Sequence, residues 1–156
     1  MKRQYKKVWL LLLLLIPFSL KAFQSNGSVK EQPKVTLTFI PQTVYPLGIA
    51  VRQVTTGFEL RISKDTVNCY LPYFGRAYST DYGTRDGGAE MISSSFSYNE
   101  NTNAKGARNI VIKPKDNKDV REIRLTIYGD GYAYVQLTFN QRQSIGYSGQ
   151  VTEQKK

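Results

Sequence analysis

The chain has 156 residues and a formal net charge of +10, from 22 Lys and Arg against 12 Asp and Glu, with no His and a single Cys. The lack of His excludes Ser-His-Asp and Cys-His catalysis, the usual zinc ligand sets and histidine acid–base chemistry. A single Cys excludes an internal disulfide, so packing must stabilise the fold.

The first 22 residues have the order of a secretory signal peptide. Basic residues at positions 2, 3, 6 and 7 precede the apolar run 8–16, which is closed by Pro17 and followed by FSLKA. The run is too short for a membrane span, which requires roughly 20 apolar residues. We expect cleavage after Ala22 and export to the periplasm or the medium. An uncleaved anchor is the alternative, because Leu20 is large for its position. No Cys lies near the leader, which excludes a lipid-anchored Cys.

Loss of the leader changes what the charge implies. Cleavage removes five of the 22 basic residues and none of the 12 acidic ones, which lowers the net charge from +10 to +5. Such a surplus is typical of a solubilising surface, and an exported chain meets little nucleic acid. We therefore expect no nucleic-acid partner, and we expect membrane contact only through the leader before its cleavage.

The mature chain divides into a flexible polar lead-in at 23–34, one domain at 35–151 and a polar tail at 152–156. Strand patterns recur through the domain, and no segment carries a sustained helical period. The clearest pattern is a hairpin in which the alternating runs 121–128 and 132–139 flank Gly129-Asp130-Gly131. Further strands are expected at 35–40, 58–62, 66–71, 95–98, 109–113 and 144–151. The sequence therefore predicts an all-β fold, a small antiparallel β-barrel or a sandwich.

Residues 70–78, YLPYFGRAY, concentrate aromatic side chains in one short stretch. A strand that enters at Tyr70 must end at Pro72, which cannot donate to a sheet, and the chain can bend again at Gly75, where positive φ costs little. Two interpretations stay open. Either the rings cap the core and Arg76 pairs with a ring or an acid, or the rings line a pocket in which Arg76 binds a carboxylate or phosphate.

Further tyrosines extend this candidate ligand-binding surface. Tyr82 follows in the next loop, and Tyr132 and Tyr134 project from one face of the predicted hairpin. These rings can stack on a sugar or simply cover the sheet. The candidate ligand-binding residues are Tyr70, Tyr73, Phe74, Arg76, Tyr78, Tyr82, Tyr132 and Tyr134.

Catalysis is not expected from the remaining residues. Cys69 alternates with apolar neighbours in TVNCYL, and we interpret it as a buried structural thiol, since no His is present to act as its base. Asp81, Asp86 and Glu90 are close enough in sequence to suggest a glycosidase carboxylate pair, but they lie in a Gly-rich polar segment that is typical of a solvated loop. We therefore predict no catalytic residue, no cofactor and no metal site.

Four segments occur together in one order: YLPYFGRAY at 70–78, the acidic Gly-Gly segment at 86–88, IKPKDNKDV at 112–120 and NQRQSIGYSG at 140–149. In this arrangement the chain resembles a bacterial family of secreted proteins, domain of unknown function 4251, over residues 35–151. The resemblance implies a lipocalin-like β-barrel in a secreted or envelope-associated protein of Gram-negative bacteria. It implies no established activity.

These observations together predict an exported, non-enzymatic binding module. Its expected partner is a small amphiphilic molecule, a glycan fragment or an envelope protein. The alternative is a structural or inhibitory envelope protein that docks through an exposed sheet face, and a barrel interior filled with side chains would favour it. A carboxylate-dependent hydrolase is the third hypothesis.

Overall fold

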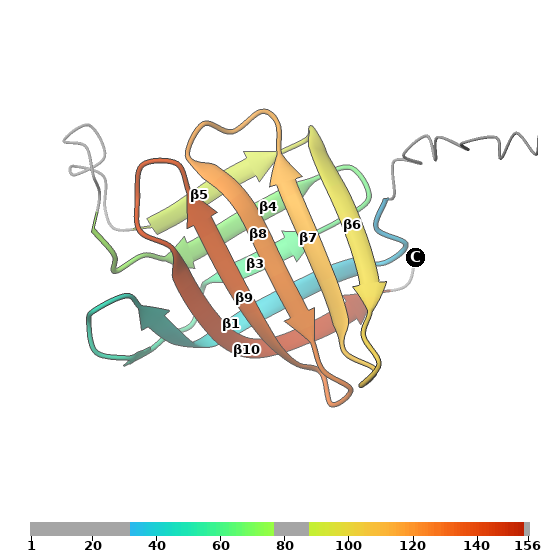
Figure 1. Cartoon of the computed structure of the whole chain (residues 1–156), viewed down its shortest axis with the longest axis horizontal. Helices are drawn as coiled ribbons and strands as arrows, with labels where there is room; N and C mark the ends of the chain where they lie inside the picture. Colours follow the sequence, from blue (N-terminus) through green and yellow to red (C-terminus); the bar gives the residue numbers. More distant parts are fainter. Residues whose placement is uncertain (1–31, 77–87, 155–156) are drawn as a thin grey trace, which may run out of the picture.

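The computed structural model describes residues 32–76 and 88–154, and within these ranges the protein consists of antiparallel β-strands and connecting loops without a helix. Accordingly, the described residues include no helix long and apolar enough to cross a membrane. One sheet of ten strands curves into a nearly closed barrel (Figure 1). The strands are β1 (Thr36–Pro46), β2 (Arg52–Gln53), β3 (Glu59–Ile62), β4 (Val67–Pro72), β5 (Gly88–Ser93), β6 (Phe96–Thr102), β7 (Arg108–Pro114), β8 (Val120–Ile127), β9 (Tyr132–Phe139) and β10 (Ile145–Gln154).

The first long strand pairs with the last one in the middle of the sheet. The strand order is β5-β4-β3-β1-β10-β9-β8-β7-β6, with β2 paired to β1 outside this path. The β1–β10 ladder runs from Thr36 opposite Gln154 to Pro46 opposite Ile145, with an irregularity between Pro41 and Thr43. Such a bulge increases the local bend of a strand and helps a sheet to curve into a barrel.

The sheet ends at β5 and β6, and a short turn joins these two strands. The Asp116 carboxylate holds the turn: it accepts hydrogen bonds from the Ser94 and Ser95 amides at 2.9 and 3.0 Å and from the Ser93 hydroxyl. The bond from Ser93, together with the amide bonds, lowers the pKa of Asp116 to about 2. The turn thereby brings the two sheet ends together at one corner, and the barrel is nearly closed.

The interior of the barrel is filled with side chains. Each strand turns alternate residues inward, as in β9, where Ala133, Val135, Leu137 and Phe139 are all at most 4% exposed. The largest fully buried side chains are Tyr147 and Phe39, which face the interior from the two central strands. The predicted alternation of the hairpin strands is thus confirmed, and the all-β antiparallel fold with it.

The predicted Gly-Asp-Gly turn is also confirmed. The Tyr128 amide donates to the Tyr132 carbonyl at 2.8 Å, and Gly131 has a φ of 80°. A residue in this left-handed region is typical of three-residue hairpin loops, and Gly adopts it without steric cost.

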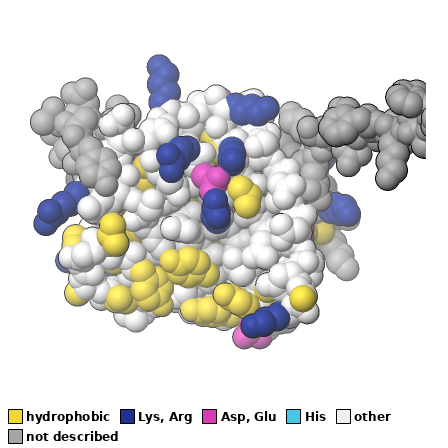
Figure 2. All heavy atoms as spheres, viewed as in Figure 1, with side chains coloured by type: hydrophobic (Ala, Val, Ile, Leu, Met, Phe, Trp, Pro, Cys, Tyr) yellow, Lys and Arg dark blue, Asp and Glu magenta, His cyan; other side chains and the backbone are white. Residues whose placement is uncertain are grey.

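Charged and apolar side chains occupy different parts of the outer surface. Glu122 on β8 pairs with Lys113 at 3.5 Å and with Arg124. Most charged side chains on the face drawn in Figure 2 lie in its upper part. Hydrophobic side chains gather along the lower part of the same face, over β9, β10 and β1 and out to the β1–β2 hairpin (Figure 2). On this face the hydrophobic side chains are therefore mostly separated from the charged ones.

Some elements differ from the expectation. The strand at β1 continues beyond residue 40 to Pro46, although prolines occupy positions 41 and 46, and β6 continues to Thr102. Residues 88–93 form β5 instead of part of a polar loop, because Ala89 and Met91 turn inward while Glu90 and Ile92 face outward. The two glycines at 87 and 88 hid this alternation in the sequence.

Candidate functional site

The candidate ligand-binding residues that the structure describes do not line one common pocket. Tyr73, Phe74 and Arg76 lie at one end of the barrel, Tyr70 lies on the outer face of β4, and Tyr132 and Tyr134 lie on β9. Tyr78 and Tyr82 lie outside the described residues, as do Asp81 and Asp86.

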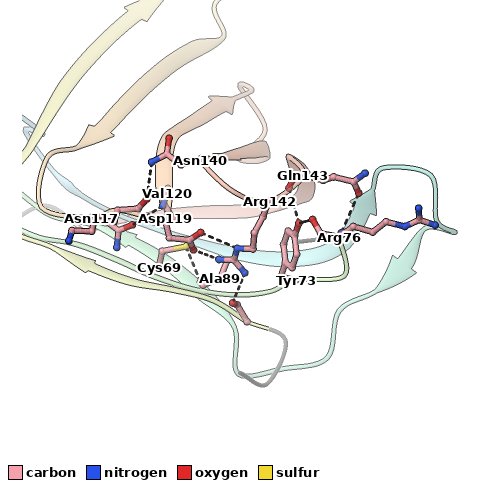
Figure 3. Close-up of polar contacts among 12 residues, drawn as sticks. Cys69, Tyr73, Arg76, Ala89, Asn117, Asp119, Val120, Asn140, Arg142 and Gln143 are labelled. Atoms are coloured by element: carbon pink, nitrogen blue, oxygen red, sulfur yellow. Dashed lines mark hydrogen bonds and ion pairs between the residues drawn. The ribbon is translucent and has the colours of Figure 1, made fainter. Parts of the chain in front are cut away.

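Tyr73 belongs to a set of contacts at the barrel end, which we call the barrel-end network: Tyr73, Arg76, Asp119, Arg142 and Gln143 (Figure 3). The Tyr73 ring packs edge-on against Phe139, with centroids 5.2 Å apart. Its hydroxyl lies 3.1 and 3.0 Å from the carbonyl oxygens of Arg76 and Gln143, to which it donates. Tyr73 therefore ties the segment after β4 to the loop between β9 and β10.

Arg142 is the centre of the barrel-end network. Its guanidinium forms an ion pair with Asp119, donating from Nε at 3.1 Å, and it donates to the Gly88 carbonyl at 3.2 Å. It also lies over the rings of Tyr73 and Phe139, at 4.5 and 4.3 Å from their centroids. Its side chain is only 10% exposed. This role of Arg142 could not be predicted from the sequence, because a charge in a polar loop carries no periodicity.

The bend at Gly75 has a different cause from the expected one. The φ of Gly75 is not positive, but a Cβ at this position would lie 2.3 Å from the Tyr73 hydroxyl oxygen. Glycine is present because the Tyr73 ring folds back onto the chain. The predicted end of the strand at Pro72 is confirmed.

Arg76 contributes its backbone to the network and leaves its side chain exposed. The Arg76 amide donates to the Gln143 side-chain oxygen at 3.3 Å, and the Gln143 amide donates to the Arg76 carbonyl at 3.0 Å. The neighbouring Phe74 is half-buried, and the Arg52 guanidinium lies 4.9 Å from its ring centroid. The first interpretation of the aromatic corner thus describes Tyr73, whereas Arg76 remains accessible to a partner.

Tyr70 lies in an open hollow of about 590 Å³ on the outer face of β3, β4 and β5. Its ring is 43% exposed and stacks on Phe58 with centroids 5.1 Å apart. The strand register places Glu59 on one side of Tyr70 and Glu90 on the other. Asn68 also lines the hollow. An aromatic ring between two carboxylates results. Glu59 could not be identified from the sequence, because placing it beside Tyr70 requires the register between the two strands.

Tyr134 and Tyr45 cover the outer face of β10. Their ring centroids are 6.2 Å apart, and the Tyr45 hydroxyl lies 3.1 Å from the Ser148 hydroxyl. A Cβ at Gly146 would meet the Tyr134 hydroxyl oxygen at 2.1 Å, so the ring lies directly over that glycine. Tyr132 pairs instead with Tyr128, with ring centroids 6.0 Å apart, beside the hairpin turn.

A second hollow of about 520 Å³ is lined by charged groups that bind one another. Arg108 donates to Glu100 at 2.6 Å and also pairs with Glu153, and Tyr98 donates to Glu100 at 2.5 Å. Partial burial opposes ionisation of Glu100, but the hydrogen bonds from Tyr98 and Arg108 hold its pKa below the usual range. This hollow is therefore a structural ion-pair cluster.

Cys69 is expected to be chemically inert in the folded protein. Its side chain is fully buried, and burial raises its pKa from 9.0 to about 12, with Arg142 opposing this shift in part. Since only the thiolate is nucleophilic, iodoacetamide at pH 8 should leave the native protein unlabelled and should label it fully in denaturant, as measured by mass spectrometry. The unfolded thiol ionises above pH 9, whereas the folded one stays protonated up to about pH 12. The raised pKa of Cys69 therefore lowers the free energy of unfolding progressively from pH 9 to 12. Labelling of the native protein at the denatured rate would contradict the assignment.

One comparison with known proteins agrees with the resemblance noted in the sequence. A comparison with curated proteins gives no match. A family model matches residues 34–151, which include all the strands that build the barrel-end network and the Tyr70 hollow. The chain therefore belongs to the family described as domain of unknown function (DUF4251).

Proposed function

We propose that the protein is an exported, non-enzymatic binding module that takes a glycan fragment on the outer face of β3, β4 and β5. The observation that carries this proposal is the exposed ring of Tyr70 between Glu59 and Glu90. Export is supported by the signal-peptide pattern of residues 1–22.

The side chains that line the hollow are suited to bind a glycan. The apolar face of a sugar ring can stack on Tyr70, and Phe58 holds that ring in place from the other side. Ionised carboxylates accept hydrogen bonds only, and sugar hydroxyls can donate to Glu59 and Glu90 on either side. The amide of Asn68 can both donate and accept. A lipocalin-like interior site is disfavoured, because buried side chains fill the barrel.

The same geometry supports binding over hydrolysis. A carboxyl group that acts as a general acid needs a pKa raised by burial. Glu90 is exposed, and the Glu59 side chain is 34% exposed and pairs with Arg61 at 3.4 Å. Neither carboxylate is therefore buried, and Glu59 is already paired with Arg61.

Binding of soluble oligosaccharides by calorimetry tests this proposal. The probes are oligosaccharides of glucose, galactose and N-acetylglucosamine. Tyr70→Ala should weaken binding of the recognised oligosaccharide about tenfold or more, because it removes the stacking surface, and Glu90→Gln should weaken it less. Tyr128→Ala is the matched control, since Tyr128 is 45% exposed and also pairs with a second ring. Equal affinity of the Tyr70→Ala protein and the wild type would reject the site, and failure of every oligosaccharide to bind would reject the ligand class.

The packed interior favours a second candidate, a structural or inhibitory protein of the cell envelope that docks through its outer surface. This role needs no small ligand. It predicts that the domain co-purifies from the envelope fraction with one protein in a fixed ratio, and that Tyr70→Ala leaves this complex intact.

A further inference from the structure

The hairpin between β1 and β2 carries an exposed apolar tip, residues 47–51, with the sequence LGIAV (Figure 1). Leu47, Ile49 and Val51 are 65%, 40% and 56% exposed. Gly48 makes the turn with a φ of 71°, and a Cβ there would meet no atom within 4 Å. The tip thus extends away from the barrel into open space.

Folding does not explain this sequence. Surface hairpin turns are usually built from Asn, Asp, Gly, Ser and Pro, and a run of exposed apolar residues is costly unless it has a function. The tip contributes little to the sheet, since β2 pairs with β1 at only two positions, Gln53 opposite Thr43 and Arg52 opposite Val44. The apolar tip therefore indicates an interaction with something outside the chain.

Basic and aromatic groups surround the base of the apolar tip. Arg52 follows the tip directly, and it is exposed and lies over the Phe74 ring. Arg76 comes two residues after Phe74 and is also exposed. Tyr45, 39% exposed, precedes the tip. No acidic residue occurs between positions 32 and 58. The hairpin thus carries an apolar tip flanked by Tyr45 and Arg52, and Arg76 adds a second exposed guanidinium from the segment after β4.

We propose that the apolar tip docks the domain on an anionic lipid bilayer. Leu47, Ile49 and Val51 enter the boundary between headgroups and acyl chains, Tyr45 lies at headgroup level, and Arg52 and Arg76 contact lipid phosphates. This extends the expectation from the sequence, which limited membrane contact to the leader. The site is separate from the Tyr70 hollow.

The shape and charge of the hairpin favour a lipid surface over a protein partner. A stable protein interface buries about 800 Å² on each side, in a patch of about 20 or more residues. The apolar tip is five residues long and protrudes, so it offers a protein little contact surface, whereas a fluid bilayer closes around a protrusion. The exposed guanidinium groups match the negative surface of anionic lipids.

Sedimentation with vesicles tests the proposal. The chain without residues 1–22, which contains every strand of the barrel, is mixed with vesicles of phosphatidylglycerol and phosphatidylcholine in equal parts or of phosphatidylcholine alone. We expect binding to the anionic vesicles that weakens when salt is raised, because salt screens the Arg–phosphate attraction. Leu47→Asp should weaken this binding about tenfold or more, and the double variant Arg52→Gln, Arg76→Gln should remove most of its salt dependence.

Ile92→Asp is the control, because Ile92 is 73% exposed on β5, away from the hairpin. Ile92→Asp adds the same charge as Leu47→Asp but far from the apolar tip, so it should bind vesicles like the wild type. Thermal melting of each variant checks that it is folded; Ile49→Ser replaces Leu47→Asp if that variant unfolds. The proposal is overturned if the wild type does not sediment with anionic vesicles. It is equally overturned if folded tip variants bind as tightly as the wild type, or if Ile92→Asp weakens binding as much as Leu47→Asp.

Discussion

Replacing Arg142 with Met is expected to lower the free energy of unfolding by about 3 kcal/mol and the melting temperature by about 10 °C. Met keeps most of the buried volume but leaves the Asp119 carboxylate, 19% exposed, without its cation. It also removes the donor to the Gly88 carbonyl and the guanidinium that lies over Tyr73 and Phe139. Urea denaturation followed by tyrosine fluorescence, together with thermal melting, gives both quantities.

Arg124→Met is the matched control for this prediction. Arg124 also pairs with a carboxylate, that of Glu122, but its side chain is 62% exposed. Exposed ion pairs contribute at most about 1 kcal/mol, so this variant should melt close to the wild type. Adding Asp119→Asn to Arg142→Met should recover part of the loss, because the unpaired charge disappears. Equal melting temperatures of the two Arg variants would show that the barrel-end network is dispensable.

Gly149→Ala is expected to destabilise the protein by about 3 kcal/mol or more. A Cβ at Gly149 would lie 2.0 Å from the Ile40 carbonyl oxygen and 2.9 Å from the Ile40 carbonyl carbon. Both atoms belong to the backbone of β1, next to its bulge, and cannot rotate away as a side chain can. The added methyl group must therefore push apart the two central strands of the barrel. Chemical denaturation measures the loss.

Substitutions at two further glycines provide a comparison for the cost of Gly149→Ala. A Cβ at Gly146 would meet the hydroxyl end of Tyr134, which is partly exposed and can move, so Gly146→Ala should cost less than Gly149→Ala. Gly129 has no atom within 4 Å of its added Cβ and does not require a positive φ. Gly129→Ala should therefore be neutral or stabilise the protein by up to about 1 kcal/mol. A result in which all three variants behave alike would contradict the steric argument.

Strand alternation allowed much of the fold to be predicted. The runs around Gly129-Asp130-Gly131 alternate strictly between apolar and polar residues, and they became β8 and β9 with the expected faces inward. The sequence hid β5, because glycines lead into it and only two apolar residues, Ala89 and Met91, show its buried face. It also hid the full length of β1, since prolines usually interrupt strands. Pro41 is accommodated beside a bulge, and Pro46 ends the strand.

The candidate site was harder to predict than the fold. The aromatic residues at 70–76 belong to different surfaces, because Tyr73 is buried at the barrel end and Tyr70 faces outward on β4. The residues beside these rings come from distant positions in the sequence: Arg142 lies over Tyr73, and Glu90 lies opposite Tyr70. Only register between strands brings such residues together, and one sequence does not contain that register explicitly.

The central pairing of β1 with β10 determines when the chain can become a barrel. The ladder joins Thr36 to Gln154, so it forms only after almost the whole domain has been synthesised. Closing so long a loop costs chain entropy before any contact repays it, and topologies dominated by such distant pairs fold slowly. Until β10 is in place, β1 and β9 both present unpaired edges, and the two groups of strands that they border share no common ladder. Without β10 the chain therefore forms two half-sheets whose exposed edges can pair with other chains. The final strand, ten residues long, joins them into one cooperative unit.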